Sequence, residues 1–321
     1  MKTNFQFYNT YYFNSISGYL KNEFSNKVIK LSVDGGFTCP NRDGTLSSDG
    51  CIFCSENGSG DFAGKRNASI ADQLSSQILL LKNKWPNAKY IVYFQNYTNT
   101  YGDLDKLKSL YYEALSFPDI IGIAIATRPD CISDDVYSLL SDLNKKTFLW
   151  VELGLQTIHN ETAILINRCY PLEAYENCHK RLNNLGIKSV VHLILGLPGE
   201  SIFQMLETAR YVSNQNVFGV KLQLLHILKG TPLEAYFEAN PDEFHCLGFN
   251  EYINLVVDIL ELFPKETTIH RLTGDGPKDL LVEPLWSLNK FKVMNEINTE
   301  FRKRKSFQGI HNYSCTNLPS L

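Results

Sequence analysis

Three cysteines, Cys39, Cys51 and Cys54, lie close together in a stretch that directly follows the largely apolar run 28–33. A structural tetrahedral site takes four protein ligands, whereas three thiolates leave one coordination position open for a ligand on which chemistry can be done. Eleven residues separate Cys39 from Cys51, and two separate Cys51 from Cys54. This spacing predicts a Cys-x-x-Cys pair on one side of a metal centre, with the loop bringing Cys39 to the other side.

The segment between the cysteines has the composition of a loop. Pro40 blocks helix continuation, Asp43 and Gly44 form a turn signal, and Gly50 gives the chain freedom directly before Cys51. On ligation logic we favour an iron-sulfur cluster with a non-protein fourth ligand. The alternatives are a zinc site completed by a distant His, Cys or Asp, and ordinary thiols or a disulfide.

The segments 35–45 (GGFTCPNRDGT) and 50–54 (GCIFC) resemble the cluster loop of a radical S-adenosylmethionine (SAM) family, in a bacterial branch near the catalytic subunit of Elongator. This family departs from the commoner Cys-x-x-x-Cys-x-x-Cys spacing, and the similarity runs through most of the chain. The resemblance implies a [4Fe-4S] cluster and SAM as cofactors. It also implies an electron donor such as flavodoxin or ferredoxin, and reductive cleavage of SAM to a 5'-deoxyadenosyl radical.

Six apolar segments alternate with helical patterns along the chain, at residues 28–33, 90–94, 120–126, 148–155, 189–195 and 217–225. This alternation predicts right-handed crossovers and a parallel α/β sheet, either a barrel or an open doubly wound sheet. The family resemblance implies a partial (β/α)6 TIM-like barrel of the radical SAM type. We expect an N-terminal arm at 1–22, the core at 23–235, and a C-terminal extension at 236–321 that covers the barrel mouth.

In either architecture, functional residues gather at the carboxyl ends of the strands. The polar run 95–102 follows the second strand, where the resemblance implies that Gln95, Asn96 and Thr98 meet the methionine amino group of SAM. A turn-rich surface loop is the alternative. Arg128, after the third strand, could anchor a carboxylate or phosphate, or pair with Asp130.

Glu152 lies within the otherwise apolar fourth strand, and a buried carboxylate is costly unless it has a partner in a polar barrel mouth. We therefore expect Glu152 to serve the site. The resemblance implies that Glu152 and Gln156 face SAM or the substrate, with a ribose hydroxyl as one contact. It also implies that Gly196, in the turn after the fifth strand, passes backbone against the adenine.

Two further groups are candidates for the substrate site. His226 follows Lys221 and Gln223 at near-alternate positions of the sixth strand, although a lone histidine is more often a satisfied core residue. His270 and Arg271 precede a Gly-Asp-Gly turn on a short strand. The resemblance favours a substrate role for this pair as a lid over the barrel, and a structural ion pair is the alternative.

The bulk properties limit the class of protein. The 321 residues carry a net charge of -3. The protein as a whole therefore lacks the positive electrostatic field that is typical of a general nucleic-acid binder. No signal core or long apolar run appears, so we expect a cytoplasmic protein without membrane contact.

The aromatic residues of 1–20 are interpreted as an arm packed over the core, and most other cysteines as buried thiols. The basic residues 302–305 either complement a helix dipole or contact phosphate.

The substrate is the least determined part of the prediction. The resemblance implies modification of the tRNA wobble uridine at its C5 side chain, from carboxymethylaminomethyl to aminomethyl, with Arg128 or Arg271 holding the carboxylate. A radical SAM enzyme that acts on a small molecule or peptide is the alternative enzyme. A zinc-binding scaffold protein is the alternative without catalysis.

Overall fold

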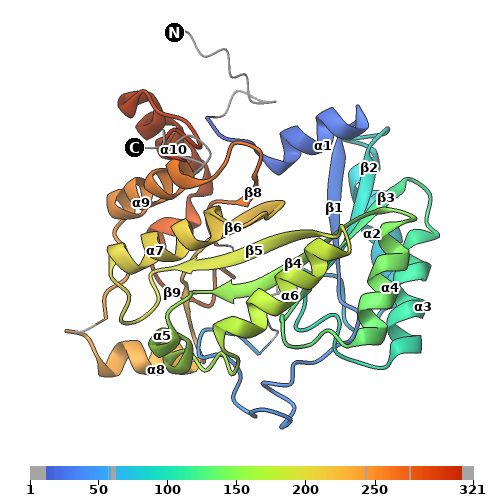
Figure 1. The fold of residues 1–321 in the computed structure, drawn as a ribbon, viewed down its shortest axis with the longest axis horizontal. Helices are drawn as coiled ribbons and strands as arrows, with labels where there is room; N and C mark the ends of the chain where they lie inside the picture. Colours follow the sequence, from blue (N-terminus) through green and yellow to red (C-terminus); the bar gives the residue numbers. More distant parts are fainter. Residues whose placement is uncertain (1–11, 57, 59–62, 243, 275, 313–321) are drawn as a thin grey trace, which may run out of the picture.

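The computed structural model describes residues 12–56, 58, 63–242, 244–274 and 276–312. Its centre is a curled parallel sheet, as the sequence predicts, with the strand order β1-β2-β3-β4-β5-β6-β8 (Figure 1). The strands are β1 (Val28–Val33), β2 (Lys89–Phe94), β3 (Ile120–Thr127), β4 (Phe148–Gln156), β5 (Lys188–Leu195), β6 (Gly219–Leu224) and β8 (Thr268–Arg271). All six expected strands are present, and β8 adds a seventh beside β6.

Alternation along the strands divides the core into an outer and an inner layer. Val92 and Phe94 of β2 pack outward against the helices, whereas Ile91 and Tyr93 point to the inner, concave side. The same alternation in β4 places Trp150 inward, and therefore also Glu152. By the same alternation in β5 and β6, the inner face also receives His192, Lys221 and Gln223. The concave face of the sheet thus carries a group of large polar side chains from three neighbouring strands.

Helices between the strands cover the outer face of the sheet (Figure 1). They are α2 (Ile70–Lys82), α3 (Leu104–Leu115), α4 (Asp134–Asn144), α6 (Leu172–Asn184) and α7 (Ile202–Ser213). Ser69 caps the start of α2, because its hydroxyl accepts the Asp72 backbone N–H at 3.0 Å. The short helix α5 (Asn160–Leu165) between β4 and α6 was not predicted.

The C-terminal part of the chain, expected to cover the barrel mouth, takes several positions. Helices α9 (Phe249–Leu262) and α10 (Lys290–Arg304) pack against each other, and α9 also packs on α7. The strand β7 (Ile227–Leu228), which precedes α8 (Pro232–Ala239), pairs antiparallel with β9 (Leu281–Glu283), which precedes the 3-10 helix η1 (Leu285–Leu288). The His270–Arg271 strand is β8 itself, so it extends the sheet, and the segment that follows it lies near the strand ends.

The described part of the N-terminal arm joins this C-terminal part. It comprises residues 12–15 and helix α1 (Ile16–Phe24). Tyr12 stacks on Phe301 with ring centroids 5.7 Å apart, and the Ile269 N–H donates to the Asn14 carbonyl at 2.8 Å. Phe13 is buried. The aromatic residues Phe5, Phe7, Tyr8 and Tyr11 lie outside the described residues.

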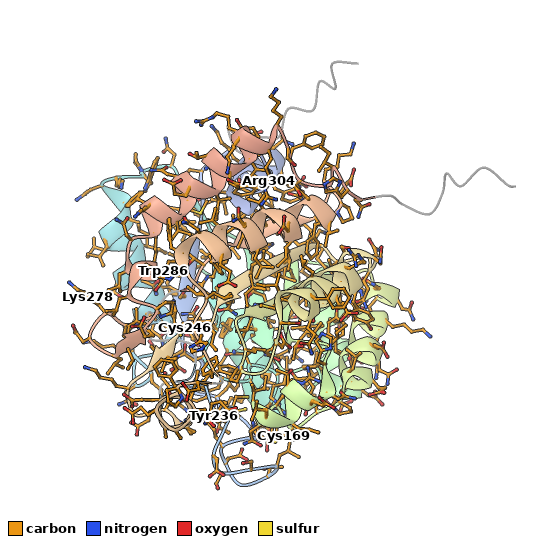
Figure 2. All side chains as sticks on the ribbon, turned by 90° about the vertical axis from the view of Figure 1, so that its left-hand side faces the viewer. Cys169, Tyr236, Cys246, Lys278, Trp286 and Arg304 are labelled. Atoms are coloured by element: carbon orange, nitrogen blue, oxygen red, sulfur yellow. The ribbon has the colours of Figure 1, made fainter. Side chains whose placement is uncertain are left out.

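The basic residues that end α10 differ in their surroundings. Arg304 bonds the carboxylates of Glu300, on its own helix, and Asp258 on α9, and it lies 3.6 Å from Glu261 (Figure 2). Lys303 pairs with Glu300 at 3.3 Å. Arg304 is therefore an ion-pair residue between two helices.

The cysteines outside the loop are less buried than expected. Of the four described, only Cys178 is fully buried, and Cys169 is exposed, so the prediction is wrong for Cys169. Cys169 follows a tight turn with its own φ at 61°, which brings its side chain to the surface. Cys315 lies outside the described residues. None of the described helices is long and apolar enough to cross a membrane.

Candidate active site

The three cysteines of the loop line one cavity at the carboxyl ends of the strands. This first cavity encloses about 770 Å³ of atom-free space, part of it open to solvent, and a second cavity of about 820 Å³ adjoins it. The two cavities share five lining residues, which are Phe53, Cys54, Gly58, Gln156 and His192. The thiols and the second cavity therefore belong to one continuous site.

The cysteine loop is held by the segment that follows β4 and α5. Asn41 donates its side-chain amide to the Asn167 carbonyl at 2.6 Å, and Asn167 donates in return to the Gly50 carbonyl at 2.7 Å. The Ile52 N–H donates to the Ile166 carbonyl at 3.2 Å. Asn167 has a φ of 53°, a left-handed conformation that asparagine tolerates better than most residues. These bonds fix the backbone on both sides of Cys51.

The surroundings of the thiols fit an anionic metal cluster. Burial, followed by the charge of Cys54, raises the pKa of Cys51 to about 12, so a cation is needed to keep this thiol ionised. The guanidinium groups of Arg128 and Arg168 both lie 4.7 Å from the ring centre of Tyr170, which lines the first cavity. Arg168 is 1% exposed, and its Nη2 has no hydrogen-bond partner among the described residues. An anion in the first cavity would balance the positive charge of these two guanidinium groups.

No disulfide joins the described cysteines. In the described ranges, no three His, Cys, Asp or Glu side chains gather as ligands of a single metal ion.

The predicted residues after β2 and β3 divide into two groups. Gln95 and Thr98 line the first cavity, and the buried Thr98 hydroxyl has no partner among the described residues, so it is available to a ligand. Asn96 instead donates to the Asp34 carboxylate at 2.6 Å. Arg128 lines the cavity and bonds both oxygens of Asp130, at 3.0 and 2.8 Å. Its fork is therefore occupied by Asp130.

Glu152 is fully buried and accepts hydrogen bonds from four side chains. Trp150 Nε1 donates to Oε1 at 2.9 Å, and the Tyr93 hydroxyl and His192 Nε2 each donate to Oε2 at 2.8 Å. Lys221 Nζ also donates to Oε2. Burial raises the pKa of Glu152, but the Lys221 charge and the His192 bond outweigh it and hold that pKa well below its usual range. Glu152 is therefore a carboxylate whose bonds are made within the protein.

Sequence reasoning did not select His192 or Tyr93, although both line the first cavity. His192 carried a signal, because a histidine in an apolar strand raises the same question as Glu152. Its neighbour across the sheet is Lys221, a pairing set by strand register. Tyr93 carried no signal, because aromatic residues are ordinary in strands.

The second cavity is lined by Gln223, His226 and Arg271, together with glycines of the turn after β8. A Cβ on Gly274 would lie 2.6 Å from the His226 ring, and one on Gly276 would lie 2.8 Å from it. Both glycines are therefore needed for the turn to pack on this imidazole. Burial, followed by the charges of Lys290 and Arg271, lowers the pKa of His226 to about 4.

His270, Gly196 and Gln156 have different positions. His270 is not among the residues that line either cavity; its ring packs against Trp150 with centroids 5.5 Å apart. Gly196 also lines neither cavity, and its φ of 90° is a conformation that favours glycine. Gln156 lines both cavities and accepts a hydrogen bond from the Tyr170 hydroxyl at 3.0 Å.

Comparison with known families and proteins identifies the chain's relatives. Residues 39–212 match the radical SAM superfamily, and residues 217–303 match the radical SAM C-terminal domain. YtqA of Bacillus subtilis is 46% identical over 92% of each chain, and YhcC of Escherichia coli is 36% identical over 89% of this chain and 91% of its own.

More distant relatives belong to Elongator. Elongator complex protein 3 of Saccharomyces cerevisiae is 25% identical over 60% of this chain and 34% of its own length. The solved structure of Methanocaldococcus infernus Elp3 shares the fold, with a TM-score of 0.66 and 18% identity over 88% of this chain and 64% of that one. With the cysteine-lined cavity and the curled parallel sheet, these matches show that the chain belongs to the radical SAM superfamily of enzymes.

Proposed function

We propose that Cys39, Cys51 and Cys54 hold a [4Fe-4S] cluster, and that the enzyme acts on the C5 side chain of the tRNA wobble uridine. The observation that carries the first part is that all three thiols line one cavity, which opens onto a second. When bound, the cluster and SAM together supply a 5'-deoxyadenosyl radical.

Residues around the first cavity would orient SAM. The Thr98 hydroxyl is buried and without a partner among the described residues, and Gln95 and Gln156 present amides to the same space. Arg128 and Arg168 provide positive charge near the thiols. Gly196 and Asn96 do not line the first cavity, so they would act indirectly, by holding the conformation of the backbone next to it.

The second cavity would receive the substrate. Gln223, His226 and Arg271 line this cavity, where they supply hydrogen-bonding groups and, in Arg271, a positive charge for a carboxylate. His270 would act through its neighbour Arg271 on β8. The net charge of -3 favours a small contact area, in which a single flipped nucleotide enters the cavity.

The likeness to Elongator's catalytic subunit supports the tRNA assignment. A one-electron donor such as flavodoxin or ferredoxin would reduce the cluster. A small molecule or peptide is the second candidate substrate, because the polar groups that line the second cavity could bind such a ligand as well.

Anaerobic reconstitution with iron and sulfide tests the cofactor assignment. We expect absorbance near roughly 400 nm, typical of thiolate-ligated clusters, and 5'-deoxyadenosine after reduction in the presence of SAM. Uptake of zinc without this absorbance would contradict the cluster.

Nucleoside analysis tests the substrate. Total tRNA is compared between cells that have the gene and cells that lack it, with the Cys51→Ala variant as the matched control. We expect the carboxymethylaminomethyl nucleoside to accumulate in the deletion strain and in the variant. Identical wobble-uridine profiles in all three strains would rule out the tRNA substrate.

A further inference from the structure

Four polar side chains from four different strands meet on the concave face of the sheet. They are Tyr93 of β2, Glu152 of β4, His192 of β5 and Lys221 of β6, here called the buried quartet. Lys221 Nζ bonds Glu152 and also the Tyr93 hydroxyl, the latter at 2.8 Å. Buried polar and charged groups are costly unless each one is hydrogen-bonded. The hydrogen bonds within the quartet therefore define the protonation state of its members.

The bond between His192 and Glu152 fixes which ring nitrogen carries the proton. An ionised carboxylate can only accept, so His192 Nε2, at 2.8 Å from Oε2, is the protonated nitrogen. Nδ1 then keeps a lone pair. The side-chain amide of Gln223 lies 3.4 Å from Nδ1, a long and weak contact that a ligand can replace.

His192 is the quartet member that lines both cavities. Its side chain is 17% exposed, whereas that of Glu152 is fully buried and that of Lys221 is 3% exposed. Gln223, the neighbour of Nδ1, lines the second cavity. The lone pair of Nδ1 therefore lies on the side from which a molecule in the second cavity would approach.

Burial and the nearby Lys221 charge keep the His192 imidazole neutral. Burial, followed by the Lys221 charge, lowers the pKa of His192 to about 4, and Glu152 opposes this change. The surrounding charged and titratable groups are Glu152 on β4, Lys221 on β6 and Arg271 on β8. Tyr93 and Lys30, on β2 and β1, contact the same network through Glu152. The imidazole is neutral at pH 7.

We propose that His192 is a general base that takes a proton from an N–H or O–H group of the substrate in the second cavity. The substrate class is an amine or alcohol whose heteroatom adjoins the reacting carbon. The bond from hydrogen to the heteroatom breaks, its electron pair stays on the heteroatom, and a new N–H bond forms at Nδ1. Glu152 is the positioning residue that stabilises the imidazolium. The inference rests on the proposed function, because it assigns the second cavity to the substrate.

Acylation by diethyl pyrocarbonate tests the state of His192 without any substrate. The reagent reacts with neutral imidazole, and peptide mass spectrometry of the cluster-loaded protein locates each modified histidine. N-acetylhistidine in the same tube reports an ordinary imidazole, which titrates near about pH 6.5. We expect the His192 rate to stay constant between about pH 5 and pH 8 while that of the reference falls on the acid side. No acylation of His192, or a decline parallel to the reference, would overturn the proposal.

The second measurement is the coupling ratio, the amount of modified nucleoside formed per 5'-deoxyadenosine. The probe is total tRNA from a strain that lacks the gene. Loss of a general base costs about 100- to 10,000-fold, so His192→Gln should lower the ratio by at least about 100-fold. Added imidazole should restore part of the ratio in His192→Ala. A purely structural role would lower both products together and leave the ratio unchanged, which would overturn the proposal.

The control is His179→Gln. His179 is also buried, but it bonds Asn183 and Ser189 between α6 and β5, away from both cavities. We expect its coupling ratio to equal that of the wild type. If wild-type enzyme forms 5'-deoxyadenosine but leaves the tRNA unchanged, the tRNA assignment fails, while the acylation result still decides whether His192 is accessible and neutral, as the proposal requires.

Discussion

The cysteine loop and the buried quartet face the same cavity, but they are built in opposite ways. The loop places its thiols through backbone bonds to the segment 166–168, and polar groups around it, such as the Thr98 hydroxyl and Arg168 Nη2, have no partner among the described residues. In the quartet, each side chain bonds another that comes from a different strand. One region requires a ligand to complete it, and the other is complete before any ligand arrives.

This difference predicts that substitutions in the two regions have different consequences. Changes in the loop should remove cofactor and activity while leaving the fold intact. Changes in the quartet should lower the free energy of unfolding, because they leave a buried charge without its partner.

The largest effect is expected for Cys51→Ala. The cluster needs all three thiolates, so 5'-deoxyadenosine formation and bound iron should fall to background while the melting temperature of the iron-free protein stays the same. The measurements are iron analysis, product chromatography and circular dichroism. Cys246→Ala, outside both cavities, is the control that should keep its iron. Turnover by Cys51→Ala would contradict the ligand assignment.

The next largest effect, now on stability, is expected for Glu152→Gln. This change leaves the Lys221 ammonium buried without a carboxylate, which should cost about 3–5 kcal/mol in the free energy of unfolding measured with urea. Asp142→Asn is the matched control, since Asp142 pairs with Lys145 at the surface and should contribute less than about 1 kcal/mol. Equal losses in both variants would mean that the quartet does not stabilise the sheet.

Acid should weaken the quartet side of the site. Burial and Lys221 lower the pKa of His192 to about 4 in the folded protein. In the unfolded chain this histidine becomes protonated near about pH 6.5, whereas in the folded protein it stays neutral until about pH 4. Stability is therefore full above pH 6.5 and falls as the pH drops through this window, by at most about 3 kcal/mol. Urea unfolding at several pH values measures this loss. His192→Gln should show a shallower dependence, and an unchanged dependence would show that other groups cause it.

A smaller effect is expected for Asn167→Ala. This change removes the bond to the Gly50 carbonyl and places alanine at a φ of 53°, which together should cost about 1–2 kcal/mol and lower the iron retained by the loop. Iron content after gel filtration is the measurement. Asn144→Ala, which removes an exposed bond to Gly186, is the control. Full iron retention in Asn167→Ala would show that the segment does not hold the loop.

The fold was largely predictable because periodicity is a local signal. The six apolar runs predicted the first six strands of the sheet. The seventh strand, Thr268–Arg271, was expected only as a short strand in a lid. Four residues cannot show which edge they join, and the pairing with β6 is a long-range contact.

The three cysteines could be selected as candidate ligands because their residue type alone suggests the chemistry, and the structure places them along one cavity. Site residues were harder to predict where the direction of the side chain decides whether it reaches the cavity. Sequence placed Asn96 beside Gln95 and Thr98, yet Asn96 turns to Asp34. His192 could be recognised as a site residue only from the strand register. The register pairs His192 with Lys221 on β6, and it pairs Glu152 on β4 with the residue two positions before His192. Register depends on the packed sheet, which no local pattern contains.

The contact between residues 12–15 and the segment around Gln308 has a consequence for synthesis. Asn14 bonds Gln308, 294 positions later, and its carbonyl accepts from Ile269 of β8. During translation, the edge of β6 has no partner strand until residues 268–271 have been made, and Asn14 has no Gln308 partner until later still. The nascent chain therefore exposes an unpaired strand edge in this interval, in which chaperones would protect it from aggregation.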